Sequence, residues 1–214
     1  MPKVKIPRKS TTIDMTAMCD VAFLLLSFFI LATKQKPPEV LTVSPPASVS
    51  AKAAPEKSIL ITLTKDGKVF LMLGDDTKKA DILNNINAAK SLNLSPAELA
   101  KWNKAPFIGL PFNQIKSSLS IAREIPANQL PGIPTDSTNN EMVDWMRSIT
   151  NVYAGTDQRK LQEMLLIKGD NDALYPAFKR VKDALKKNEI FKFRIVTSGE
   201  GIPAGSELYL KGNK

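Results

Sequence analysis

An apolar run near the amino terminus dominates the pattern of hydrophobic and polar positions in this chain. Residues 15–33, MTAMCDVAFLLLSFFILAT, are interrupted by a single formal charge, Asp20. At about 1.5 Å per residue, a helix over this run covers most of a hydrocarbon core of roughly 30 Å. The pattern therefore predicts one transmembrane helix over residues 15–33.

The basic residues around this run predict its orientation. Four Lys/Arg residues lie within residues 1–9, and two lysines follow the run by residue 36. Because short basic segments tend to stay in the cytoplasm, we expect residues 1–14 to form a cytoplasmic tail and the rest of the chain to lie outside. The alternative is a cleaved secretory signal. The poor cleavage site at residues 31–33 and the presence of Asp20 favour an uncleaved anchor.

The pattern changes twice beyond the apolar run. Residues 34–57 are rich in proline, alanine and small polar residues, which predicts an extended linker. Residues 58–74 contain two short β-rich runs around Asp66-Gly67, which is typical of a tight hairpin turn. A helix capped by Thr77 follows over residues 77–92.

The carboxyl-terminal part predicts a strand over 163–168, a helix over 175–187 and a strand over 192–197. Such a crossover implies parallel pairing, and residues 207–210 are a candidate edge strand. In between, helices are expected from Ser95-Pro96, over 113–122 and over 139–153. We interpret residues 91–162 as an insertion. The fold class is α+β: a small mixed sheet in residues 58–214 with helices packed against one face.

The amino-acid composition excludes several classes of function. The chain has no histidine, one cysteine and a formal net charge of +9. Serine–histidine catalysis, thiolate zinc sites and an internal disulfide are thereby excluded. No nucleic-acid motif stands out, and Asp170 and Asp172 are best explained by turn formation. We predict no enzyme activity, no metal site, no cofactor and no nucleic-acid partner.

Asp20 is the most informative residue of the apolar run. A carboxylate at membrane depth costs at least about 2.5 kcal/mol, so it should face protein or water. At helical spacing Thr16 and Ser27 share its face, which predicts an accessory polar surface suited to a partner helix. The alternative places Asp20 about one turn from the cytoplasmic interface, where it snorkels or takes a proton.

This arrangement resembles the ExbD/TolR family. The run IDMTAMCDVAFLLLSFFIL is similar to the family's helix, with Asp20 at the position of its membrane aspartate. The closing stretch of residues 165–197 is similar to the family's last strand-helix-strand unit. VSPPAS resembles the linker element V-x-L-P-x-A-S, with Ser44 and Pro45 departing from the usual residues; its members are Val43, Ser44, Pro45, Pro46, Ala47 and Ser48.

The resemblance implies a single-pass protein of the bacterial inner membrane with a periplasmic domain. It implies a subunit of a proton-motive-force-driven motor that energises TonB-dependent transport, in which Asp20 takes up and releases the proton. The implied partners are a pore-forming protein of the ExbB/TolQ type, a TonB-like or TolA-like transducer, and a second copy in a homodimer. Two alternatives are a TolR-like subunit for envelope integrity and a membrane-anchored periplasmic binding module.

Overall fold

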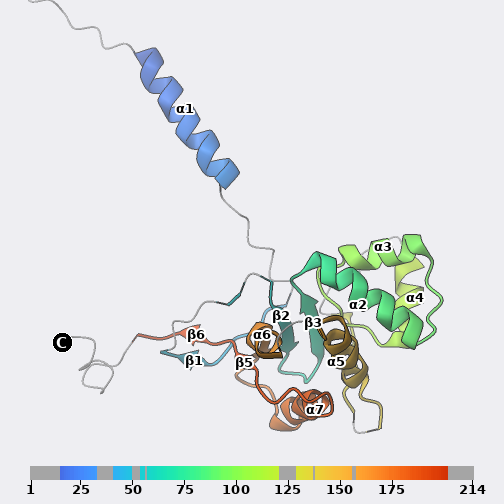
Figure 1. The fold of residues 1–214 in the computed structure, drawn as a ribbon. Coiled ribbons are helices and arrows are strands. Elements are labelled where there is room, and N and C mark those ends of the chain that lie inside the picture. The colour runs from blue at the N-terminus through green and yellow to red at the C-terminus, as the bar shows by residue number, and fades with distance from the viewer. Residues whose placement is uncertain are drawn as a thin grey trace, which may run out of the picture. The chain divides into compact units, whose positions relative to one another are not determined.

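The computed structural model describes residues 15–32, 41–49, 54–55, 57–120, 129–136, 138–155 and 158–201 (Figure 1). The chain divides into two units, Met1–Glu39 and Val40–Lys214. In the first unit, helix α1 spans Met15–Ala32 and contains no buried residue. It is the one helix in the described part of the chain that is long and apolar enough to cross a membrane. A helix is therefore present over residues 15–32 of the predicted span 15–33.

A four-stranded mixed sheet forms the centre of the second unit. Strands β2 (Ile59–Leu63) and β3 (Val69–Leu73) pair antiparallel. The turn between them uses Gly67, whose φ of 77° is the left-handed conformation that glycine adopts easily. Strand β4 (Leu165–Gly169) pairs parallel with β2, and β5 (Arg194–Ile195) pairs parallel with β4. The order β3-β2-β4-β5 confirms the predicted mixed sheet and its parallel crossover.

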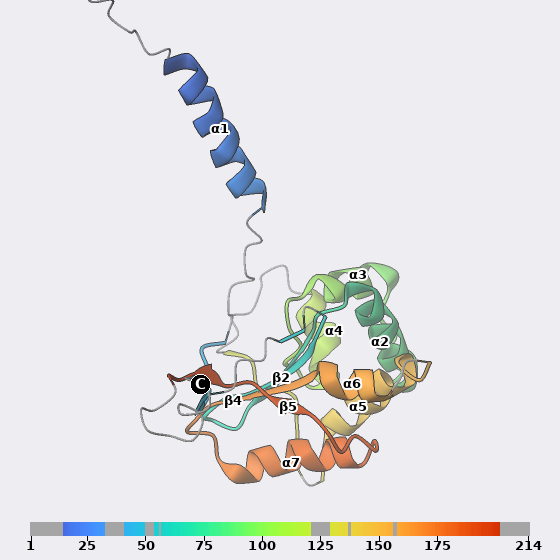
Figure 2. The same cartoon turned by 60° about the vertical axis from the view of Figure 1, so that its left-hand side comes forward.

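Six helices accompany this sheet in the described residues (Figure 2). They are α2 (Asp76–Ala89), α3 (Pro96–Lys104), α4 (Phe112–Ser120), α5 (Glu141–Val152), α6 (Gln158–Met164) and α7 (Tyr175–Lys186). Ser95 forms a capping box with Glu98, as its sequence context predicts. The predicted cap of α2 is wrong by two residues, because the Asp75 carboxylate accepts the N–H groups of Thr77 and Lys78. Helix α6 was not predicted.

One face of the sheet forms the hydrophobic core. Alternate strand residues, among them Ile61, Leu71 and Ile167, are at most 1% exposed. The same core contains buried residues from 91–162, namely Leu94, Trp102, Ile108, Phe112, Ile115, Ile133, Met142, Trp145, Met146, Ile149, Tyr153 and Leu161. Residues 91–162, which we interpreted as an insertion, therefore supply much of the core that covers the sheet.

The carboxyl-terminal elements depart from prediction in detail. Strand β5 has only two residues, fewer than the strand predicted over 192–197, and Ile195 is 54% exposed. Tyr175 is 63% exposed, whereas Val181 and Leu185 of the same helix are buried. Tyr175 lies at the start of a helix and Ile195 lies in an outer strand of the sheet, where neighbouring elements cover only part of a side chain. The residue type alone does not reveal such a position. The candidate strand over 207–210 lies outside the described residues.

Candidate functional site

Asp20 lies in the second turn of α1 and is the only charged residue of that helix. Thr16 precedes it by four residues and Ser27 follows it by seven, so at about 100° per residue both lie within roughly 40° of its direction. The Ser27 hydroxyl donates to the carbonyl of Leu24 in the same helix over 3.0 Å. This bond uses the Ser27 hydroxyl hydrogen within the helix itself.

The chemistry of this face follows from its single carboxyl group. In a membrane, a carboxylate requires protein or water around it. A carboxyl group alternates between a neutral acid and an anion by gaining or losing one proton. No group of three or more metal-ligating side chains was found among the described residues.

The motif residues 43–48 form part of the second unit. Val43 is 6% exposed, and β1 (Ala47–Ser48) pairs parallel with β6 (Ser198–Gly199). The N–H groups of Ser198 and Glu200 donate to the carbonyls of Pro46 and Ser48, each over 3.0 Å. We expected residues 34–57 to be an extended linker. The structure instead joins residues 43–48 to the domain by main-chain hydrogen bonds.

The turn after β4 holds the start of this motif. The N–H of Asn171 donates to the Ser44 carbonyl over 2.8 Å, and the N–H of Ser44 donates to Asp170 Oδ2 over 3.4 Å. The other carboxylate oxygen of Asp170 accepts the N–H of Asp172 over 3.1 Å. Asp170 thus forms the turn expected from the sequence and also binds the motif. This second role could be recognised only once the fold was known.

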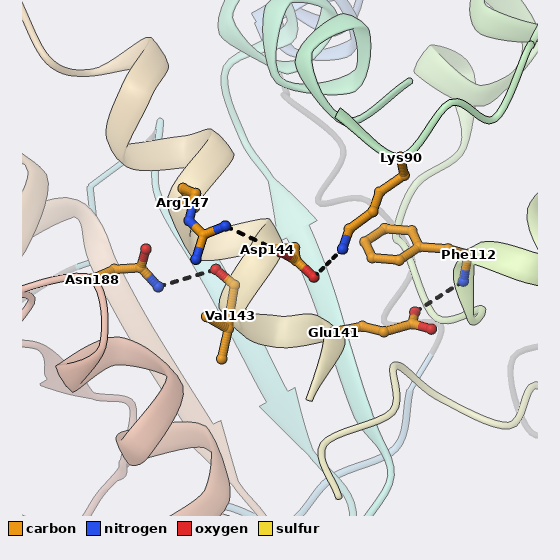
Figure 3. A network of polar contacts seen from close by, with 7 residues as sticks. All are labelled: Lys90, Phe112, Glu141, Val143, Asp144, Arg147 and Asn188. Carbon is orange, nitrogen blue, oxygen red and sulfur yellow. Dashed lines mark hydrogen bonds and ion pairs between the residues drawn. The ribbon is translucent and has the colours of Figure 1, made fainter. Parts of the chain in front are cut away.

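A polar network around α5 escaped sequence reasoning (Figure 3). Asp144 forms ion pairs with Lys90 and with Arg147. Glu141 is 8% exposed and accepts the N–H of Phe112, at the start of α4, over 2.9 Å. The sequence feature that could have indicated this network is the pair of acidic residues, Glu141 and Asp144, in the first turn of α5. Carboxylates are favoured there because the amino-terminal end of a helix is positive.

Burial perturbs the ionisation of two groups in this region. Burial raises the pKa of the Glu141 carboxyl, against the lowering effects of the Phe112 N–H, the Asn139 side chain and the Lys90 charge. Burial also lowers the pKa of the Lys79 ammonium, although Asp76 raises it. Lys79 Nζ donates to the Ala105 carbonyl over 2.6 Å. These groups stabilise helix ends within the core, which is a structural role.

The apolar helix with one carboxyl group is consistent with a single-pass membrane protein that carries a separate α+β domain. A scan against protein-family models matches residues 7–200 to the family described as biopolymer transport protein ExbD/TolR. The chain therefore belongs to the ExbD/TolR family. The match extends across residues 91–162 and includes both Asp20 and the motif at 43–48. Searches of curated proteins and of solved structures found no significant match.

Proposed function

We propose that this protein is the inner-membrane subunit of a proton-motive-force-driven motor that energises TonB-dependent transport across the outer membrane. In this proposal, Asp20 takes up a proton from one side of the membrane and releases it to the other. The protein performs no enzymatic catalysis. Its membership of a biopolymer-transport family supports the general function.

The observation that carries the proposal is the position of Asp20. It is the only charge on a helix whose other residues suit a membrane. One proton crossing a potential of 100 mV provides about 2.3 kcal/mol, which exceeds the net energy of a typical hydrogen bond between membrane helices. The energy available from proton exchange at Asp20 is thus large enough to shift α1 between two packing arrangements.

The same position requires a partner. A single helix does not enclose its own polar face, and contacts between membrane helices provide only about 0.6 to 2 kcal/mol each. We propose that two copies of α1 lie inside a ring of helices from a pore-forming protein of the ExbB/TolQ type. The amino terminus then lies in the cytoplasm and the α+β domain in the periplasm, where it meets a TonB-like or TolA-like transducer.

Replacement of Asp20 tests this function in cells. Asp20→Asn keeps the size and polarity of the side chain but does not exchange a proton. We expect it to abolish energised uptake through the outer membrane while the protein reaches the membrane and copurifies with its partner. Asp20→Glu, the matched control, keeps the carboxyl group and should retain measurable uptake. Uptake at the wild-type rate in Asp20→Asn would refute the motor function.

Copurification separates the two branches of the family. Recovery of TonB with the complex, together with loss of iron or vitamin uptake in a deletion strain, supports the transport function. Recovery of TolA, together with detergent sensitivity, supports an envelope-integrity subunit instead. A membrane-anchored binding module would keep its function when α1 is replaced by an unrelated anchor.

A further inference from the structure

The amino-terminal end of α7 exposes two large apolar side chains. Leu174 is 69% exposed and Tyr175 is 63% exposed. Leu174 occupies the N-cap position, where no side-chain capping bond is formed. Polar residues such as serine are preferred there, because their side chains accept a main-chain N–H and a leucine side chain does not. Leu174 therefore neither packs into the domain nor caps the helix, so the stability of the fold does not account for its presence.

The outer side of α7 continues from this apolar pair as a row of lysines. Three lysines follow Tyr175 at i+4, i+7 and i+11, which places them on the same side of the helix. The opposite side packs into the core through Ala177, Val181, Ala184 and Leu185. Asp183 is the one acidic residue of α7. We define the α7 face as Leu174, Tyr175, Lys179, Lys182 and Lys186.

The side chains of the α7 face suit the surface of a membrane. Tyrosine is enriched at the boundary between acyl chains and headgroups, where its ring is apolar and its hydroxyl is hydrated. A lysine at this boundary lays its apolar stem along the surface and extends its ammonium group to lipid phosphates. Each lysine near an anionic lipid surface strengthens binding by about fivefold, so three lysines strengthen it by about 100-fold.

The connection from α1 meets the domain beside this face. The N–H of Asn171 donates to the carbonyl of Ser44, so the start of the motif lies at the turn before α7. Asn171 precedes Leu174 by three residues, and their Cα atoms are therefore at most about 11 Å apart. Residues 33–42 join α1 to the motif in the sequence. The membrane that contains α1 is thus a surface that the chain itself brings within reach of the α7 face.

We propose that the α7 face binds the anionic phospholipid surface of the membrane that α1 spans. Leu174 and Tyr175 enter the headgroup region, and the lysines contact lipid phosphates. An acidic protein would also attract the lysines, but the connection to α1 keeps a membrane beside the face. The inference shares with the proposed function the placement of α1 in a membrane. It goes beyond that function, because it assigns a lipid-binding surface to the α+β domain and does not involve Asp20.

Fluorescence quenching tests this binding on the full chain held in nanodiscs. Asn171→Cys, at an exposed position beside the α7 face, carries a fluorescent label in a Cys19→Ser background. Spin-labelled lipid headgroups quench a label that reaches the membrane surface. We expect strong quenching in nanodiscs that contain phosphatidylglycerol, and weaker quenching in zwitterionic nanodiscs or in high salt. A label at Ser117→Cys, exposed on α4, should be quenched little in either, because α4 and α7 lie on opposite sides of the domain (Figure 2).

Replacement of the apolar pair separates lipid binding from folding. The double variant Leu174→Ser/Tyr175→Ser removes two exposed apolar side chains and supplies a capping hydroxyl at the N-cap. We expect its quenching in phosphatidylglycerol nanodiscs to fall to the zwitterionic level. Its thermal unfolding should occur at the same temperature as that of the wild type or at a higher one, because the helix is better capped. A purely structural role for the pair predicts the opposite result in both measurements.

Replacement of lysines tests the contribution of charge. Lys179→Gln/Lys186→Gln removes two exposed charges from the α7 face and should lower the ratio of bound to free domain by about 25-fold. Lys104→Gln/Lys116→Gln removes two exposed charges from α3 and α4 and is the matched control, since it changes the net charge equally. The control should be quenched as the wild type is.

Several results would overturn the proposal. They are equal quenching of the wild type and Leu174→Ser/Tyr175→Ser, equal quenching in anionic and zwitterionic nanodiscs, and an equal loss in the two lysine variants. Binding of soluble polyglutamate to the α7 lysines, without quenching by lipid, would assign the face to an acidic protein instead. Asp20→Asn should be quenched as the wild type is, so a failure of the motor function and a failure of lipid binding are distinguishable.

Discussion

The main-chain N–H of Asn171 donates to the carbonyl of Ser44 over 2.8 Å, joining residues that lie far apart in the sequence. This bond holds the motif at 43–48 beside the turn that follows β4. Within the motif, β1 pairs with β6 (Figure 1). While the motif stays bound, only residues 33–42 separate it from α1 in the sequence. Ten extended residues span at most about 36 Å. Release of the motif would lengthen this connection.

We predict that Val43 anchors the motif. Val43→Ala removes buried apolar surface worth about 1 to 2 kcal/mol, which should open the segment locally without unfolding the domain. Hydrogen exchange should become faster at the amides of Asn171, Ser198 and Glu200, whose acceptors belong to the motif. Val49→Ala, at a residue that is 43% exposed, is the control and should leave these rates unchanged. Unchanged exchange in Val43→Ala would show that the hydrogen bonds alone hold the segment.

Gly109 permits close packing behind β3. A Cβ at this position would overlap the ring of Phe70, which is 1% exposed and packs against Phe107. We expect Gly109→Ala to lower the free energy of unfolding by about 1 to 3 kcal/mol.

Phe70→Ala should remove this clash, so the double variant should be more stable than the sum of the two single changes implies, by about 0.5 to 3 kcal/mol. Denaturant titration measures the cycle. Gly155→Ala is the control, because nothing lies within 4 Å of its added Cβ. Strict additivity of the two changes in the free energy of unfolding would exclude contact with Phe70 as the cause of the destabilisation by Gly109→Ala.

Glu141 should make stability depend on pH. Burial raises the pKa of its carboxyl in the folded chain above the ordinary value of about 4.3. The folded state therefore binds this proton more tightly than the unfolded state does. The stabilisation is full below the ordinary pKa and is lost as the pH rises through the folded pKa.

Glu141→Gln should flatten this part of the pH profile, because the amide oxygen still accepts the Phe112 N–H but does not ionise. At neutral pH we expect the variant to be as stable as the wild type, or more stable by up to about 1 kcal/mol. Thermal unfolding between pH 4 and pH 8 measures the difference. Glu163→Gln, at an exposed position, is the control. Identical pH profiles for Glu141→Gln and the wild type would rule out Glu141 as the source of the pH-dependent stability.

Local signals were sufficient for several elements of the fold. The apolar run specified α1, Asp66-Gly67 specified the hairpin, and Ser95-Pro96 specified the start of α3, because each depends on neighbouring residues alone. The stripe of Met142, Trp145, Met146, Ile149 and Tyr153 was likewise buried as its helical period predicts.

Long-range relationships did not follow from the sequence. Pairing of β1 with β6 joins residue 47 to residue 198, and two-residue strands have no periodicity to detect. The core role of 91–162 depends on the packing of Trp102 and Phe112 against Trp145, with ring centroids 5.8 and 5.6 Å apart. Asp20, Thr16 and Ser27 could be grouped from spacing alone, since a helix fixes their relative directions.

The central claim is that Asp20 carries the proton, and proton flux tests it most directly. The complex with its pore-forming partner is reconstituted into vesicles that contain a pH-sensitive dye, and a membrane potential is imposed. We predict that the wild-type complex acidifies the vesicle interior, that Asp20→Glu retains part of this flux, and that Asp20→Asn reduces it to the rate of vesicles containing the partner alone. Flux through Asp20→Asn equal to that of the wild type would contradict the account.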